Sequence, residues 1–98
     1  MPAMNPFQIM KAARIILTRL RLDATTVVLQ FDRGTLIMSG KVQHIFSIEG
    51  KRNNLNRELL HEMDRRFRRI EGVRQIEYIL ENWALNSDGH WNVKKHTH

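Results

Sequence analysis

The sequence has no cysteine and no long apolar run. The absence of cysteine excludes disulfides, thiol catalysis and Cys-based zinc or iron–sulfur sites. No stretch approaches the roughly 18–20 apolar residues that span a bilayer. The first residues also lack the basic segment and the apolar segment of a secretory signal. We therefore expect a cytoplasmic protein without a membrane span.

Recognisable catalytic motifs are missing as well. The chain has no P-loop, no GxGxxG sequence and no nucleophile elbow. His90, His96 and His98 could bind a transition metal only weakly, because a flexible tail does not preorganise its ligands. His61 has no companion nucleophile. We expect no enzymatic activity, no cofactor and no metal site.

The composition is typical of one small globular domain. The chain has 98 residues, of which 42% are hydrophobic and 27% are charged. These values exclude a wholly disordered chain. The 16 Lys and Arg against 10 Asp and Glu give a formal net charge of +6. Such a surplus permits a nucleic acid, an anionic membrane surface or an acidic protein as the partner, without selecting among them.

Asn5 and Pro6 predict the start of a helix. Asn can cap the free backbone N–H groups, Pro suits the first helical position, and Gln8 can complete a capping box. The apolar residues that follow share one arc of a helix, which should face a core. They are Ile9, Ala12, Ala13, Ile16, Leu17 and Leu20.

The opposite side of this helix is basic. The first 22 residues hold four basic side chains and no acidic one. Ile15 and Leu22 fall among the basic residues, where helical periodicity expects polar side chains. Either these two aliphatic residues lie under a loop or a neighbouring strand, or they form a contact surface for a partner or a membrane with Lys11, Arg14 and Arg21.

A β-hairpin is predicted on both sides of Gly34, because two β-branched, apolar segments flank a turn signal. Placing their apolar residues on one face fixes the register and implies a loop of two or four residues, with Gly34 at positive φ. This register pairs Phe31 with Leu36, Leu29 with Met38, Val27 with Gly40 and Thr25 with Val42. Gly40, inside a strand, indicates a bulge or a close approach by another element.

A long second helix is expected from about Ser47 to Ile70, with Gly72 after its end. Several arginines project from its outer side, including Arg57, Arg65 and Arg68. Two acidic residues can neutralise part of this charge, because Glu62 can pair with Arg65 or Arg66 and Asp64 with Arg68. The arginines are therefore either a solvated, self-paired face or the phosphate contacts of a nucleic-acid-binding protein.

In residues 73–80 the side chains alternate with the two-residue period of a β-strand. Ile76, Tyr78 and Leu80 should face the helices, which leaves Ile79 on the other side of the sheet. Val28, Ile37 and Ile79 would then form a modest apolar patch on an open sheet face, through which the chain could self-associate.

Residues 81–98 are predicted to be an extension of a domain that covers 1–80. A turn cluster at 86–89 separates two short apolar segments, which could form a hairpin that extends the sheet. From Lys94 onward we expect a frayed tail. Trp83 and Trp91 either cover an open end of the core or anchor at lipid headgroups or bases.

The element order predicts an α+β fold of order αββαβ. Two amphipathic helices should pack on one face of a small, mainly antiparallel or mixed three-stranded sheet. Two motifs with a helix between them carry a family resemblance: Gly34-x-Leu36-x-Met38-x-Gly40-x-Val42 and Gly72-Val73-x-x-Ile76-x-Tyr78-x-Leu80. Over about 7–80 the chain resembles the BON domain, the bacterial OsmY and nodulation domain.

The resemblance implies a non-catalytic module that contacts a phospholipid surface or holds a protein assembly together. Its motif residues Gly34, Gly40, Gly72 and Val73 look structural. Our first hypothesis is therefore a BON-like binding or scaffolding module, with a protein or an anionic membrane surface as partner and a homodimer among its forms. The alternative is a small basic, KH-like nucleic-acid-binding protein, because 50–53 faintly resembles a KH loop.

Overall fold

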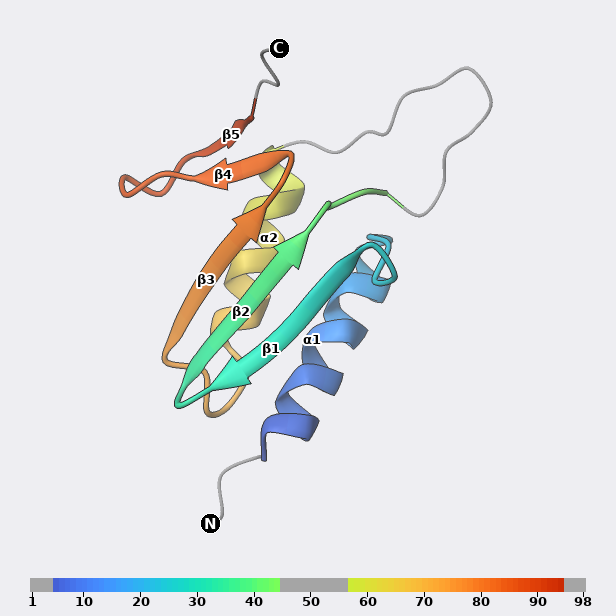
Figure 1. Cartoon of the computed structure of the whole chain (residues 1–98), viewed down its shortest axis with the longest axis vertical. Coiled ribbons are helices and arrows are strands. Elements are labelled where there is room, and N and C mark those ends of the chain that lie inside the picture. The colour runs from blue at the N-terminus through green and yellow to red at the C-terminus, as the bar shows by residue number, and fades with distance from the viewer. Residues whose placement is uncertain (1–4, 45–56, 95–98) are drawn as a thin grey trace.

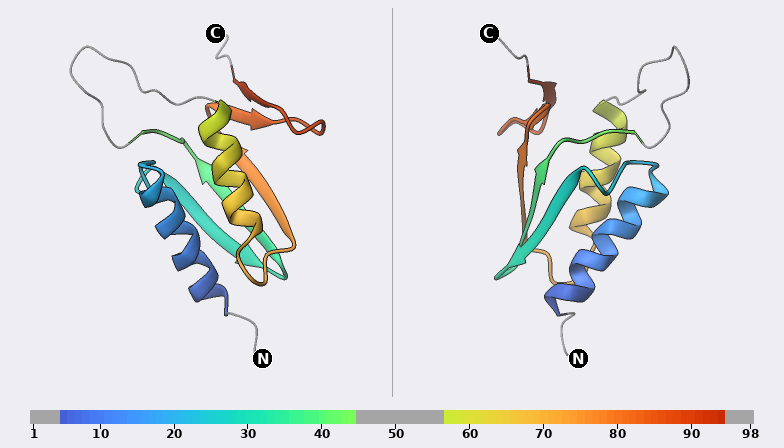
Figure 2. Two further views of the ribbon diagram at one scale, coloured as in Figure 1. Left: turned by 180° about the vertical axis from the view of Figure 1, so that it is seen from behind. Right: turned by 45° about the vertical axis from the view of Figure 1, so that its right-hand side comes forward.

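The computed structural model describes residues 5–44 and 57–94 (Figure 1). Strands β1, β2 and β3 form one sheet in that order, and both helices lie on the same face of it (Figure 2). The α+β fold of order αββαβ is thus confirmed, while the predicted helix start at Ser47 lies outside the described residues. The elements are α1 (Pro6–Arg19), β1 (Val27–Asp32), β2 (Thr35–Gly40), α2 (Arg57–Arg68), β3 (Gln75–Leu80), β4 (Trp83–Leu85) and β5 (Trp91–Val93).

The three-stranded sheet is mixed. β1 and β2 are antiparallel and pair in the predicted register, from Val27 with Gly40 to Asp32 with Thr35. β2 and β3 are parallel, from Thr35 with Gln75 to Gly40 with Leu80. The central strand β2 therefore has its two neighbours running in opposite directions.

The two ends of the β1–β2 hairpin are fixed by local geometry. The loop has two residues, Arg33 at φ 47° and Gly34 at φ 87°, as a primed hairpin turn requires. At the other end, the backbone N–H and the hydroxyl of Thr25 donate to the Asp23 carboxylate, at 2.8 and 2.6 Å. The predicted pair of Thr25 with Val42 is therefore wrong, because this local turn ends the ladder at Val27.

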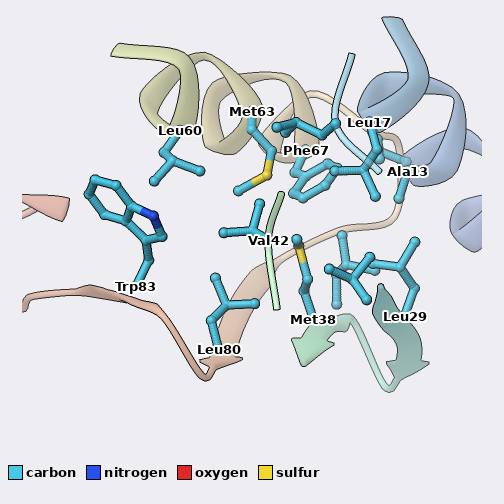
Figure 3. Packing of buried hydrophobic residues seen from close by; sticks show 14 of the residues in the cluster. Ala13, Leu17, Leu29, Met38, Val42, Leu60, Met63, Phe67, Leu80 and Trp83 are labelled. Carbon is cyan, nitrogen blue, oxygen red and sulfur yellow. The ribbon is translucent and has the colours of Figure 1, made fainter. Parts of the chain in front are cut away.

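The core lies between the helices and the sheet (Figure 3). Each helix contributes three fully or almost fully buried side chains at helical spacing, and the sheet contributes alternate residues of its strands. No polar or charged residue is buried within 5–44 and 57–94. The helix residues are Ile9, Ala13 and Leu17 of α1 and Leu60, Met63 and Phe67 of α2.

The predicted C-terminal hairpin forms, but it does not extend the sheet. β4 and β5 pair only with each other, as a separate two-stranded sheet beside α2 and the end of β3. Trp91 is fully buried, and its ring meets Tyr78 edge-to-face at a centroid distance of 4.7 Å. Trp83 is also buried, so both tryptophans cover the core, as one of the two interpretations of these residues predicts.

Two polar side chains hold this hairpin to the sheet. The Asn82 amide accepts from the Val42 N–H at 3.1 Å and donates to the Val42 carbonyl at 2.7 Å. The Lys94 ammonium donates to the Leu80 carbonyl at 2.7 Å, and the Lys94 N–H donates to the Asn82 carbonyl. The expectation that fraying starts at Lys94 is therefore wrong for that residue, and 95–98 lie outside the described residues.

Candidate binding surfaces

The chemistry-bearing side chains form no metal centre in the parts of the chain that are described. Within 5–44 and 57–94, no group of three or more His, Asp or Glu side chains could hold a metal ion. None of the helices in these ranges is long and apolar enough to cross a membrane. The sites to consider are therefore surfaces, one on α1, one on α2 and one on the sheet.

The outward side of α1 carries what we name the α1 outer surface: Phe7, Lys11, Arg14 and Ile15. Phe7 is 71% exposed and Ile15 is 44% exposed. Lys11 and Arg14 are also exposed, and neither makes an ion pair with a described residue. α1 has no acidic residue, so nothing on the helix itself neutralises them.

The start of α1 positions this surface. Asn5 and Gln8 form the predicted capping box, in which the Gln8 N–H donates to Asn5 at 2.8 Å and the Asn5 N–H donates to the Gln8 side chain at 3.1 Å. The cap fixes the first turn, from which Phe7 projects. Phe7, Met10, Lys11 and Arg14 line a hollow of about 300 Å³ on this side of the helix.

Leu22 does not belong to this surface, and its assignment there is corrected. Arg21 adopts φ 62°, and the chain closes α1 with a Schellman motif, in which Leu22 N–H donates to the Leu17 carbonyl at 2.8 Å. This motif turns Leu22 into the core, where it is fully buried and forms a β-bridge with His44. Arg21 is exposed but lies beyond the helix, so it does not continue the row of Lys11 and Arg14.

The arginines of α2 are largely paired. Glu62 forms ion pairs with Arg65 at 3.2 Å and with Arg66 at 2.9 Å. Arg68 donates to Asp64 at 2.8 Å, so both predicted pairings are confirmed. The hydrogen bond from Arg66 lowers the pKa of Glu62.

The three arginines considered as phosphate contacts, Arg57, Arg65 and Arg68, lie at opposite ends of α2. Arg65 and Arg68 lie near the C-terminal end of the helix, each beside a carboxylate. Arg57 lies at the opposite end, in the first turn. The structure does not bring the three side chains together.

The third surface is the open sheet face, which we define as Val28, Ile37 and Ile79 with their neighbours Gln30, Ser39 and Glu77. Val28 and Ile79 are each 55% exposed and Ile37 is half-buried. The helices lie behind the sheet in Figure 1, and no described element lies in front of this face. The predicted apolar patch is therefore present, and nothing in the described ranges covers it.

The motif glycines occupy positions that shape the backbone. Gly34, Gly40 and Gly72 all have positive φ, between 87° and 104°. Val73 is half-buried and packs against the core. None of the four lies on the α1 outer surface or the open sheet face, so their positions agree with a structural role.

Sequence reasoning missed the contribution of Phe7. Its spacing to Lys11 and Ile15, four and eight residues, places all three on one side of a helix, so helical periodicity could have identified it.

No family model, no curated protein and no solved structure matches this chain.

Proposed function

We propose that this chain is a non-catalytic, BON-like binding module that contacts anionic phospholipid surfaces through the α1 outer surface. One observation carries the proposal. Two cations that no described carboxylate pairs lie beside two exposed apolar side chains, Phe7 and Ile15, on one side of one helix.

The arrangement suits a helix lying along a lipid headgroup layer. Phe7 and Ile15 are eight residues apart, which is about 12 Å along the axis, and Lys11 lies between them. Apolar side chains can enter the boundary between headgroups and acyl chains while Lys and Arg stay at the charged surface. Each cation near such a surface contributes about 1 kcal/mol, and burial of Phe7 adds up to about 3 kcal/mol. Binding should therefore be reversible and sensitive to salt.

The charge pattern favours lipid over nucleic acid. A nucleic-acid site gathers several unpaired cations along a groove or patch. On α2 the carboxylates of Glu62 and Asp64 already form ion pairs with Arg65, Arg66 and Arg68. On α1 the cations come with exposed apolar groups, which phosphate contacts do not need.

Vesicle co-sedimentation tests this function. At low salt the protein should pellet with phosphatidylserine-containing vesicles and stay in solution with phosphatidylcholine vesicles, and added salt should release it. Arg14→Glu should lower the apparent affinity for these vesicles at least about tenfold, because it replaces an attracted positive charge with a negative charge that the surface repels.

Arg57→Glu is the matched control, because it makes the same charge change on an exposed residue of the other helix. It should leave vesicle binding close to the wild-type level. Equal recovery with neutral and anionic vesicles, or recovery with neither, would contradict the proposal. Retardation of RNA or duplex DNA that Arg65→Glu abolishes would support the nucleic-acid alternative instead.

A further inference from the structure

We infer that the open sheet face binds a second copy of this chain, in a symmetric dimer whose twofold axis runs parallel to β2. The inference does not rest on phospholipid binding, because it uses the other side of the molecule (Figure 2). It follows from the register of the three strands and from the charges that they carry.

The apolar residues of the face lie in two adjacent rows across the sheet. Val28 pairs with Ser39 and Ser39 pairs with Ile79, so one row has an aliphatic residue at each edge. In the next row Ile37 pairs with Gln30 and with Glu77, so the aliphatic residue is in the centre.

Two such faces are complementary when one is rotated about an axis along β2. This rotation exchanges the edge strands β1 and β3 and places β2 over β2. Val28 of each copy then lies over Ile79 of the other, and Ile37 lies over Ile37. All aliphatic side chains of the face meet aliphatic side chains, as in two aligned sheets about 10 Å apart.

The polar residues agree with the same axis. The three strands carry no basic residue, and their two acidic residues are Asp32 and Glu77. The rotation places Glu77 over Gln30 and Asp32 over Gln75, so each carboxylate meets an amide that can donate to it.

An axis across the strands is less favourable. Through the row of Ser39, it would place Glu77 over Glu81, which follows β3 directly, and bring like charges together. Through the row of Ile37, it would place Val28 over Asp32 and bury a carboxylate against an aliphatic side chain. Among the residues of the three strands, the axis along β2 brings no like charges together and places no carboxylate over an aliphatic side chain.

The size of the face predicts a weak dimer. Three strands of six residues cover about 14 Å by 20 Å, or roughly 300 Å². A standard stable interface buries about 800 Å² on each partner. The dimer should therefore form at high micromolar concentration.

Sedimentation equilibrium of the whole chain, from about 10 μM to about 1 mM, tests the association. The weight-average mass should rise from monomer toward dimer. Ile37→Lys should keep the protein monomeric, because it places two ammonium groups on the axis. Ile15→Lys, the same change at a partly exposed residue of α1, should leave the dimer intact.

Charge complementation tests the axis and does not depend on any single variant. Val28→Lys and Ile79→Glu should each weaken association at least about tenfold, because each desolvates a charge against an aliphatic partner. An equimolar mixture of the two variants should associate again, because the new ammonium then lies over the new carboxylate.

A wild-type chain that stays monomeric at about 1 mM would overturn the inference. So would a dimer that Ile37→Lys does not affect, or a mixture of the two charged variants that stays monomeric.

Discussion

Gly40 ends β2 directly against the backbone at the start of β1. Its φ is +104°, and a Cβ at this position would lie 2.5 Å from the Thr26 carbonyl oxygen and 3.1 Å from the Val27 Cα. Both contacts are with backbone atoms, which cannot rotate away as a side chain can. Glycine is therefore needed here for two separate reasons, its conformation and its lack of a side chain.

Gly40→Ala should lower the free energy of unfolding by about 3 kcal/mol, because it adds a steric clash to an unfavourable φ. Gly89→Ala separates the two causes, since Gly89 also has positive φ, +88°, but nothing lies within 4 Å of its added Cβ. That variant should lose only about 1 kcal/mol. Urea denaturation measures the free energy of unfolding of both variants. Equal losses would show that the contact with Thr26 is unimportant.

Tyr78 is the single tyrosine of the chain, and its hydroxyl is engaged. It donates to the Asp64 carboxylate at 2.8 Å, and Asp64 also accepts from Arg68. Burial, together with the negative charge of Asp64, raises the pKa of Tyr78 well above its usual value. The folded protein should therefore hold this proton at pH values where the unfolded chain releases it.

The stability contributed by Tyr78 is complete below pH 10 and declines above it. Since the unfolded chain ionises near pH 10, the free energy of unfolding should fall by about 1.4 kcal/mol per pH unit beyond that, relative to Tyr78→Phe. Absorbance of the tyrosinate ion measures the ionisation directly, because no other tyrosine contributes. A folded protein that titrates near pH 10 would contradict this account.

At the scale of elements, the Asn82 side chain prolongs the pairing of β2 with β3. The last strand pair is Gly40 with Leu80, and two residues further on both backbone groups of Val42 bond to the Asn82 amide. Val42 is almost fully buried, so water cannot replace this partner without opening the core.

Asn82→Ala should lower the free energy of unfolding by about 2–4 kcal/mol, because it leaves a buried N–H and a buried carbonyl unsatisfied. Asn86→Ala is the control, since Asn86 is exposed and its hydrogen bonds here come from its backbone. Thermal unfolding followed by circular dichroism compares the two. Similar melting temperatures of the two variants would contradict a stabilising role for the hydrogen bonds between Asn82 and Val42.

The elements that could be predicted from sequence are those with local signals. The capping box of α1 needs only Asn5 and Gln8, the β1–β2 register follows from parity across a short turn, and the α2 ion pairs join residues three or four apart. Each depends on neighbours along the chain.

The features that escaped prediction depend on distant contacts or on an unusual residue. The Schellman motif at the end of α1 has Arg21 at the position where glycine is the usual signal. The sequence therefore did not predict that Leu22 turns into the core. The contacts of Asn82 with Val42 and of Trp91 with Tyr78 join residues brought together only by the complete fold. Hydrophobic periodicity carries no information about such pairs.

At the scale of the molecule, the α1 outer surface and the open sheet face point in opposite directions. The α1 outer surface is basic, whereas the strands of the open sheet face carry only acidic charge. In the dimer that we infer, the sheets are inside and the helices outside, so the two α1 outer surfaces face away from each other. If both proposals hold, a single dimer would present one α1 outer surface to each of two lipid surfaces.

The mixed pairing of β2 also has a consequence for how the chain assembles. The partners of β2 in β1 are at most 13 residues away in sequence, but those in β3 are 40 residues away. The hairpin can therefore close early, while β3 must wait for the crossover through α2. During synthesis, the second edge of β2 therefore stays unpaired until β3 has emerged, and an unpaired strand edge favours aggregation over that interval.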